Sequence, residues 1–565
     1  MNLSIDKKNE ELAKKINFKL LFSLIGVIFT FEILSFLSYR TPLLNNIFFI
    51  LICLGAAVAT YKKLEWGLLI ILTELFIASQ GYLFYLTYHG SRLSIRIALF
   101  FIILAVWFFK HTPWKRIKEY RRDKLVKLFL VFIGVMIYGT ILGKVMGNGL
   151  KDILADGQRY VYFGLLFVFL DVYAVNHPSR GAEGGVRVLQ TEHEHPPTPL
   201  EGGFGRVARL LHLLYATIIT LTTKATLILL LTMNNVGNES STRLIYNWVR
   251  PSSRVGEITD MKNGFFRVFI QSQIFELMAI FILTLFIAYL LNMPRTKDAM
   301  NRISTGIKKY IIFYSSLLFV SCFAIVLGLS RSFWAAGFGT GIFLVGFMIF
   351  RFRLKWKAIL ASLAILAIAG FASVGIVNYA LGAKVNNRVN ASDPAASSRW
   401  KMLPPLVSAI KVHPIIGSGL GKTITYQSDD PRFKNEKNPE GWLTTYALEW
   451  GYLDFILKFG IIGTGLYLWF LGYVAWEGWK LTNPPSRGAE GGVPSSYAEL
   501  KHPPTHLEGG FESAIIAGGF LLGLIAVYAT HMLSPYLNHP LGIGYVLVCV
   551  GVFRALKNSK NEVKV

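Results

Sequence analysis

Two arginines and a glutamate stand out because each lies at the edge of an otherwise apolar stretch. Arg331 lies in LGLSRSFW (residues 327–334), Arg399 in SDPAASSRWKML (392–403) and Glu449 in YALEWGYL (446–453). A guanidinium group is a planar fork of donors that fits phosphate oxygens. A carboxylate near apolar surroundings tends to have a raised pKa, which suits a general base. Together these residue types predict a site that holds an anion and accepts a proton.

Each of these residues also has a structural interpretation, because charged groups near membrane spans serve as headgroup anchors or form internal ion pairs. Arg331 could be an anchor, Arg399 a solvated loop residue, and Glu449 an acid paired with a basic residue from another span. Asp454 and Lys458 are four residues apart, so on a helix they share a face and could neutralise one another.

The glycine-rich segment HPIIGSGLGKTITY (413–426) superficially suggests a phosphate-binding loop. It lacks the GxxxxGK[ST] spacing of such a loop, so we reject nucleotide binding there. Gly417, Gly419 and Gly421 are better suited to tight turns beside a site. His413 fits a structural role better than a catalytic one.

The composition places the whole chain in a membrane. Of its 565 residues, 53% are hydrophobic and 16% are charged. The apolar residues fall into repeated runs of about 17–25, the length that crosses a hydrocarbon core. The predicted fold class is an all-α polytopic membrane protein with about 12–14 transmembrane helices and a large external loop.

The net charge of +25 does not indicate nucleic-acid binding, because the basic residues cluster in short loops such as 110–124, 294–309 and 351–357. Short basic loops mark the cytoplasmic side of a membrane protein. Cys53, Cys322 and Cys549 lie within apolar runs, so neither a disulfide framework nor a metal site is predicted.

Alternation of the spans from a cytoplasmic N-terminus puts every short basic loop and both termini in the cytoplasm, and it puts the longer segments 145–158, 233–264 and 379–443 outside. The predicted spans are 17–38, 43–60, 67–87, 93–109, 126–144, 159–175, 207–232, 265–292, 309–329, 334–350, 357–378, 444–475, 514–533 and 537–554.

Two cytoplasmic loops carry near copies of one sequence, from PSRGAEGG at one end to LEGGF at the other, which we interpret as insertions of a mobile palindromic element in tolerant loops. The predicted division of the chain is N-terminal membrane helices (1–175), first inserted loop (176–205), central membrane helices (206–378), external loop (379–443), a membrane helix region (444–482), second inserted loop (483–512) and C-terminal membrane helices with a tail (513–565).

The order of the late motifs resembles the O-antigen ligase and O-antigen polymerase family. These motifs are Arg399-Trp400, then His413 through Gly421, then Tyr452-Leu453 followed by Gly460 and Gly463, with the SRSFW turn upstream. The likeness covers roughly residues 300–475. It implies a GT-C-like helical fold and a metal-independent glycosyltransferase that uses no cofactor.

Members of this family take a glycan from undecaprenyl pyrophosphate at the outer face of the bacterial cytoplasmic membrane. They join it to an acceptor hydroxyl, for example on another glycan or on lipid A-core. The resemblance implies that Arg331 and Arg399 hold the pyrophosphate, with Arg159 in DGQRYVYF as a third candidate and His413 as a further substrate contact.

The chain departs from the family pattern at two places, of which one is Lys458-Phe459, where the family usually has a glutamate just before the glycine. The other is before the Tyr-Leu segment. Family ligases carry His-Asn before the Tyr-Leu segment, whereas this chain has Glu449-Trp450. Glu449 takes the approximate place of the histidine that activates the acceptor, and a carboxylate can accept the same proton. The alternative function is a transporter or flippase of lipid-linked sugars, a class that commonly shows internal repeats and broken helices.

Overall fold

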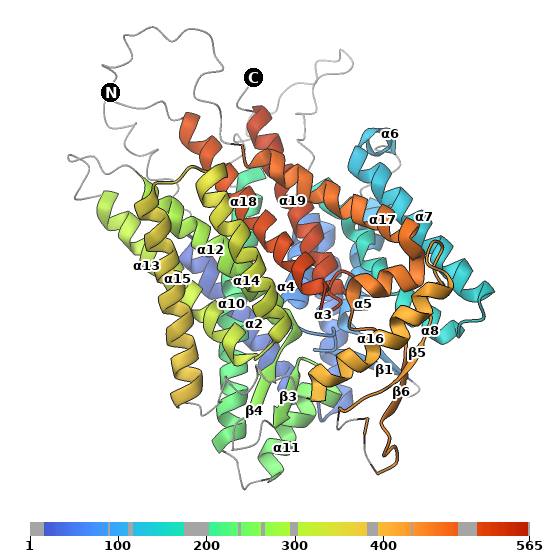
Figure 1. Ribbon diagram of the computed structural model, residues 1–565. Coiled ribbons are helices and arrows are strands. Elements are labelled where there is room, and N and C mark those ends of the chain that lie inside the picture. The colour runs from blue at the N-terminus through green and yellow to red at the C-terminus, as the bar shows by residue number, and fades with distance from the viewer. Residues whose placement is uncertain are drawn as a thin grey trace.

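Apolar helices make up most of the chain (Figure 1). The computed structural model describes residues 16–88, 91–110, 117–173, 203–234, 239–260, 266–293, 303–380, 394–430, 433–434, 436–483 and 506–562. Within these residues, 12 helical segments are long and apolar enough to cross a membrane. This confirms the predicted all-α polytopic membrane fold. Most of the two repeated copies, residues 176–202 and 484–505, lies outside the described residues.

The first half of the chain contains α2 (Phe18–Ser38), α3 (Pro42–Lys62), α4 (Leu64–Ile77), α5 (Ile95–Lys110), α6 (Ile117–Arg122), α7 (Lys124–Val145), α8 (Leu150–Gly157), a 3-10 turn (Tyr160–Leu165), α9 (Leu166–Tyr173), α10 (Gly203–Asn234), α11 (Glu239–Asn247), a 3-10 turn (Gln271–Gln273) and α12 (Ile274–Asn292). The second half contains α13 (Ile303–Leu327), α14 (Arg331–Gly346), α15 (Trp356–Gly375), α16 (Pro394–Val412), α17 (Gly451–Leu481), α18 (His506–His531) and α19 (Pro540–Glu562). Short π-helical turns follow α11, α14 and α15 at Trp248–Ser252, Phe347–Arg351 and Ile376–Ala380.

Helix α12 forms the centre of the bundle, since nearly all of its residues are buried. It packs on α18, where small residues allow a close approach. A Cβ added at Gly519 would lie 3.2 Å from the Cα of Ile282 on α12. Small residues at such crossings let helix backbones come close where lipid supplies no hydrophobic driving force between helices.

Three short antiparallel hairpins gather at one end of the bundle, opposite α6 (Figure 1). They are β1 (Tyr85–Tyr88) with β2 (Ser91–Ser94), β3 (Glu257–Asp260) with β4 (Phe266–Phe269), and β5 (Ile424–Gln427) with β6 (Trp442–Thr445). β3 and β5 fall in segments that the alternation of spans assigns to the outside, whereas most of β1 and all of β4 lie within the predicted spans 67–87 and 265–292, toward their outer ends. The membrane side itself stays a prediction.

Two predicted spans are shorter in the structure than the sequence indicates. The runs 67–87 and 93–109 correspond to α4 and α5, which have 14 and 16 residues. At about 1.5 Å per residue, α4 is about 21 Å long, against about 30 Å for a hydrocarbon core. Lys224 explains the early end, because its Nζ donates to the Ile77 carbonyl at the C-terminus of α4 (2.8 Å).

The span predicted at 444–475 also begins later, because α17 starts at Gly451. Residues 442–445 instead form β6 and pair with β5. The prediction of Glu449 inside a membrane helix is therefore wrong, and Glu449 lies in the turn that precedes α17. Its neighbour Trp450 is the N-terminal cap of that helix.

Candidate active site

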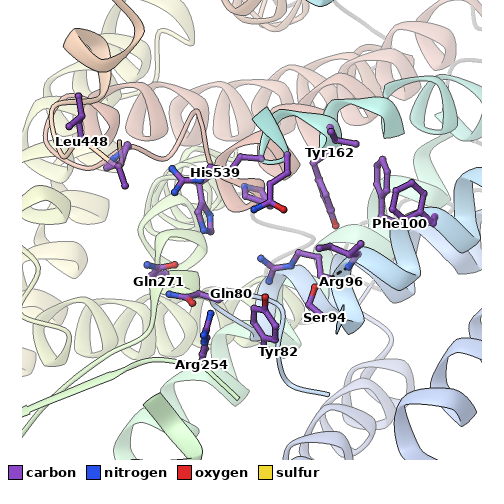
Figure 2. Close-up of a pocket in the computed structure, with 18 of the residues that line it drawn as sticks. Gln80, Tyr82, Ser94, Arg96, Phe100, Tyr162, Arg254, Gln271, Leu448 and His539 are labelled. Carbon is purple, nitrogen blue, oxygen red and sulfur yellow. Dashed lines mark hydrogen bonds between the residues drawn. The ribbon is translucent and has the colours of Figure 1, made fainter. Parts of the chain in front are cut away.

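A cavity of about 640 Å³ opens among five separate parts of the chain (Figure 2). Figure 2 shows Phe100 toward one end, Leu448 and Gln271 toward the other, and Arg96 and His539 between them. The cavity is lined by Gln80, Tyr82, Ser94, Arg96, Ile97, Phe100, Phe101, Gln158, Arg159, Val161, Tyr162, Arg254, Gln271, Ala447, Leu448, Glu449, Pro535, His539 and Pro540. One end is thus mainly apolar and the rest is polar and basic.

Two arginines in this lining form no ion pair with an acid among the described residues. The guanidinium of Arg159 stacks on the ring of Tyr446 (5.5 Å to its centre), and that of Arg254 stacks on Tyr82 (4.8 Å). Stacking on an aromatic face holds a guanidinium in place without cancelling its charge. These two residues form the anion-attracting part of the cavity.

Arg96 differs from these two, because its charge and most of its donors are already used. Its Nε and Nη2 bind both oxygens of Glu74 (2.8 and 3.3 Å), and its Nη groups donate to the carbonyls of Ala78 and Ser79 (2.6 and 3.2 Å). Both side chains are buried. Arg96 therefore shapes the cavity and holds the end of α4, and it offers an incoming anion little.

His539 faces the same space. Burial, together with the positive charges of Arg96 and Arg159, lowers the pKa of His539 well below its ordinary value. The imidazole is therefore neutral at pH 7. Its Nδ1 accepts from the backbone N–H of Leu541 (3.3 Å), which leaves the ring proton on Nε2. His539 is a neutral hydrogen-bond donor here.

Glu449 contributes a carboxylate to the cavity, and Arg399 forms an ion pair with it through Nε and Oε2. The side chains are 42% and 30% exposed, so the pair stays open to solvent. Trp450 fixes this arrangement, because its indole N–H donates to the Arg399 carbonyl (3.0 Å). Glu449 is thus paired, but its partner comes from α16 in the predicted external loop and not from another span, as the structural alternative above has it, and the pair lies at the cavity wall.

The turn that carries Glu449 rests on a fully buried charge cluster. Lys458 Nζ lies 2.7 Å from Asp454 and 2.8 Å from Asp156 on α8, and it also donates to the Tyr446 carbonyl (3.2 Å). Asn538 donates to the second oxygen of Asp454 (2.9 Å). The expected pairing of Asp454 with Lys458 is confirmed. Through the bond from Lys458 to the Tyr446 carbonyl, this charge cluster holds the 446–450 turn in place.

The glycine-rich segment packs against the break in α17, which lies at Gly460. Gly417 and Gly419 have φ values of 82° and 78°. A Cβ on Gly417 would lie 2.5 Å from the backbone N of Gly460, and one on Gly419 would lie 2.1 Å from the N of Gly143 on α7. The expected tight turns are confirmed, and they join α16, α7 and α17.

The structure brings some of the predicted site residues together and separates others. Arg159 and Glu449 line the cavity, and Arg399 reaches it through Glu449. Arg331 and His413 are not part of the described lining. Arg331 begins α14, next to Ser332, whose hydroxyl accepts from Ser534 (3.0 Å) beside the lining residue Pro535. His413 lies in the turn that follows α16, and its backbone carbonyl accepts a hydrogen bond from the N–H of Gly417 (2.9 Å).

Several lining residues were missed by the sequence reasoning. Arg254 lies in the predicted external segment 233–264, whereas short polar stretches inside predicted spans hold Gln80, Tyr82, Gln271 and His539. No local spacing links these stretches, which lie far apart in the chain. One available signal was their shared side, because the predicted alternation puts the segment 233–264, which holds Arg254, outside, and His539 and Glu449 lie near the outer ends of their predicted spans.

Comparison with known proteins adds independent evidence. Residues 316–468 match the family described as O-antigen ligase, which confirms the resemblance expected over roughly residues 300–475. The match contains Arg331, Arg399, His413 and Glu449, whereas Arg159, Arg254 and His539 lie outside it. No curated protein matches the chain. The family implies a glycosyltransferase-type enzyme with a lipid-linked glycan donor and a glycan acceptor in a membrane. Residues 316–468 of this integral membrane protein are therefore similar to the O-antigen ligase family.

Proposed function

We propose that this protein transfers a glycan from undecaprenyl pyrophosphate to an acceptor hydroxyl at the outer face of the bacterial cytoplasmic membrane. The observation that carries the proposal is the pair of arginines, Arg159 and Arg254, that line the cavity without an acidic partner among the described residues. Two such charges facing one cavity attract a ligand with concentrated negative charge. A diphosphate is a ligand of that kind.

The apolar end of the cavity suits the lipid part of this donor. Ile97 and Phe101 on α5 and Val161 in the 3-10 turn line it, and they are 37%, 59% and 51% exposed. They belong to two adjacent apolar segments, so a prenyl chain could pass between these segments into the surrounding lipid. The cavity then holds one amphiphile, with its chain at this end and its diphosphate near the arginines.

Glu449 is the proposed general base. Arg399 binds its Oε2, which leaves Oε1 for the acceptor hydroxyl. The hydroxyl oxygen attacks the anomeric carbon of the donor while its proton passes to Glu449. The bond from that carbon to the diphosphate oxygen breaks, and its electron pair leaves with undecaprenyl pyrophosphate. Arg159 and Arg254 stabilise the charge that develops on this oxygen, so we propose a metal-independent reaction.

Arg399 has a different role in this proposal from the one the family resemblance implies. Its contact with Glu449 makes it the residue that orients the base. Arg331 and His413 then support the site from outside the cavity. The acceptor enters beside Ala447 and Leu448, which line the cavity next to Glu449.

The test is glycan transfer by the purified protein in detergent, with an undecaprenyl-pyrophosphate oligosaccharide, a glycan acceptor and EDTA throughout. We expect a transferred product, and its length distribution will distinguish single transfer by a ligase from repeated transfer by a polymerase. Binding of the lipid donor without any product, combined with donor movement across proteoliposomes, would contradict the proposal and support a flippase.

A further inference from the structure

A short irregular segment, residues 78–84, forms one wall of the cavity, and we call it the strap. It begins where α4 ends, about 21 Å along a helix that would need about 30 Å to cross the hydrocarbon core. Non-helical backbone at this depth is tolerated only where it is buried in protein or lines a cavity. The strap does both, since Ala78, Ser79, Leu83 and Phe84 are buried while Gln80 and Tyr82 line the cavity.

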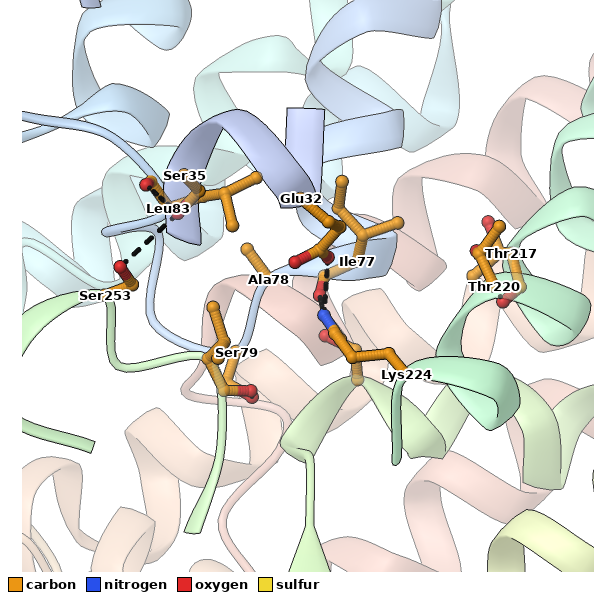
Figure 3. A network of polar contacts seen from close by, with 12 residues as sticks. Glu32, Ser35, Ile77, Ala78, Ser79, Leu83, Thr217, Thr220, Lys224 and Ser253 are labelled. Carbon is orange, nitrogen blue, oxygen red and sulfur yellow. Dashed lines mark hydrogen bonds and ion pairs between the residues drawn. The ribbon is translucent and has the colours of Figure 1, made fainter. Parts of the chain in front are cut away.

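Two buried cations, Lys224 and Arg96, hold the start of the strap, and Figure 3 shows the first of them. Lys224 on α10 donates to the Ile77 carbonyl (2.8 Å) and forms an ion pair with Glu32 on α2 (2.5 Å). Arg96 binds the next two carbonyls, those of Ala78 and Ser79. The ion pairs Lys224–Glu32 and Arg96–Glu74 thus lie in the protein interior, where their cations bind the backbone carbonyls at the end of α4. Buried charges are costly in a membrane protein, which makes them functional candidates.

The other end of the strap is fixed by neutral hydrogen bonds. The Ser35 hydroxyl donates to the Leu83 carbonyl (2.7 Å), as Figure 3 shows, and Ile95 N–H donates to the Phe84 carbonyl (3.0 Å). Between the two anchored ends, Gly81 has a φ of 85°, and a Cβ there would lie 2.7 Å from the Cβ of Arg96. This bend lets Gln80 and Tyr82, on either side of it, both face the cavity.

Ser79 links the strap to the other polar walls. Its hydroxyl donates to the carbonyl of Val255 (2.7 Å), the neighbour of Arg254, and accepts from the backbone N–H of Gln271 (2.9 Å). The Oε1 atom of Gln271 is buried without a hydrogen-bond partner among the described residues. Such an acceptor at a cavity wall calls for a donor.

We propose that Gln80, Tyr82 and Gln271 bind the sugar that is attached to the donor diphosphate, and that they set the preference for that sugar. This inference rests on the proposed function. Amide groups supply donors and acceptors for sugar hydroxyl or acetamido groups, and a tyrosine adds a flat apolar face with a polar tip. All three residues lie outside the matched family region, so this subsite is a property of this chain's own N-terminal half.

Binding measurements on the full-length protein in detergent test the subsite. The probes are undecaprenyl pyrophosphate without a sugar and the same lipid carrying N-acetylglucosamine, glucose or galactose. We expect the wild type to bind at least one glycosylated lipid about tenfold more tightly than the bare lipid, the size of one or two hydrogen bonds. The double variant Gln80→Ala/Gln271→Ala should lose this preference and bind the bare lipid as the wild type does.

Gln427→Ala is the matched control, because Gln427 is an exposed glutamine on β5 outside the cavity lining. It should keep the full preference. A double variant that still prefers the glycosylated lipid, or a wild type that binds bare and glycosylated lipids equally, would overturn the subsite and leave the proposed function standing. A wild type that binds none of the lipids would contradict the proposed function, and the subsite with it.

Discussion

Lys458 and Asp156 are 302 residues apart in the chain and form an ion pair at 2.8 Å in which both side chains are fully buried. The contact joins α17 to α8, whose next residues carry Arg159 into the cavity. The second oxygen of Asp156 accepts from the Gly421 N–H (3.1 Å), so the last glycine of the glycine-rich segment is bound to the same carboxylate. One lysine thus links three elements that position the proposed active site.

Lys458→Met should destabilise the protein by about 3–5 kcal/mol, because it leaves the carboxylates of Asp454 and Asp156 buried without their cation. The measurement is thermal unfolding in detergent. Lys434→Met is the control, since Lys434 is 51% exposed and lies 4.0 Å from its acid partner. Equal unfolding temperatures for the two variants would show that the buried cluster does not hold the structure.

Gly417→Ala should destabilise the protein by at least about 1–2 kcal/mol, the cost of a left-handed backbone for a residue with a Cβ. The added methyl would also lie 2.5 Å from the Gly460 backbone. Gly465→Ala is the matched change on α17, where a Cβ meets nothing within 4 Å. It should be neutral or slightly stabilising. Chemical denaturation of both variants compares them, and a tolerated Gly417→Ala would refute the packing described here.

Arg159→Ala and Arg254→Ala should each lower kcat/KM for glycan transfer by about a hundredfold or more, because each removes a charge proposed to stabilise the leaving diphosphate. Arg243→Ala, an exposed change on α11, should leave transfer unchanged. Unfolding temperatures near that of the wild type would exclude a loss of fold. Transfer at the wild-type rate by both cavity variants would remove the arginines from the mechanism.

The stability of the protein should fall below about pH 6.5 in part because of His539. Its folded-state pKa is lowered, first by burial and then by Arg96 and Arg159, so the unfolded chain binds the proton more readily. The contribution of the neutral imidazole to stability is complete above about pH 6.5 and is lost as the pH falls toward the lower folded-state pKa. His539→Gln should therefore lose less stability than the wild type between pH 8 and pH 5, as measured by thermal unfolding. Identical losses would contradict the neutral His539.

The sequence was sufficient for the membrane class, because apolar runs of spanning length need no knowledge of their partners. It was also sufficient for the pairing of Asp454 with Lys458, which depends only on helical spacing. The early end of α4 could not be predicted from the sequence, since Lys224 and Arg96, which bind the carbonyls at that end, come from other helices. Glu449 was placed inside a span because β6, which displaces the helix start, forms only by pairing with β5.

The candidate site was predictable in part, since Arg159, which lies outside the family match, was also among the predicted residues and lines the cavity. The family motifs pointed to Arg399 and Glu449, and the structure joins these two residues in an ion pair. Arg254 and Gln271 follow no motif. They reach the cavity because the Ser79 hydroxyl hydrogen-bonds to the carbonyl of Val255, next to Arg254, and to the backbone N–H of Gln271. No spacing in the sequence reveals these tertiary contacts.

The most direct measurement is the rate of glycan transfer in the presence of EDTA for the wild type, Glu449→Gln and the control Glu436→Gln, an exposed acid outside the cavity lining. We expect transfer by the wild type and the control, and a loss of at least about a hundredfold for Glu449→Gln, which can no longer accept the acceptor's proton. Transfer by Glu449→Gln at the wild-type rate would contradict the proposal that Glu449 is the base of this site.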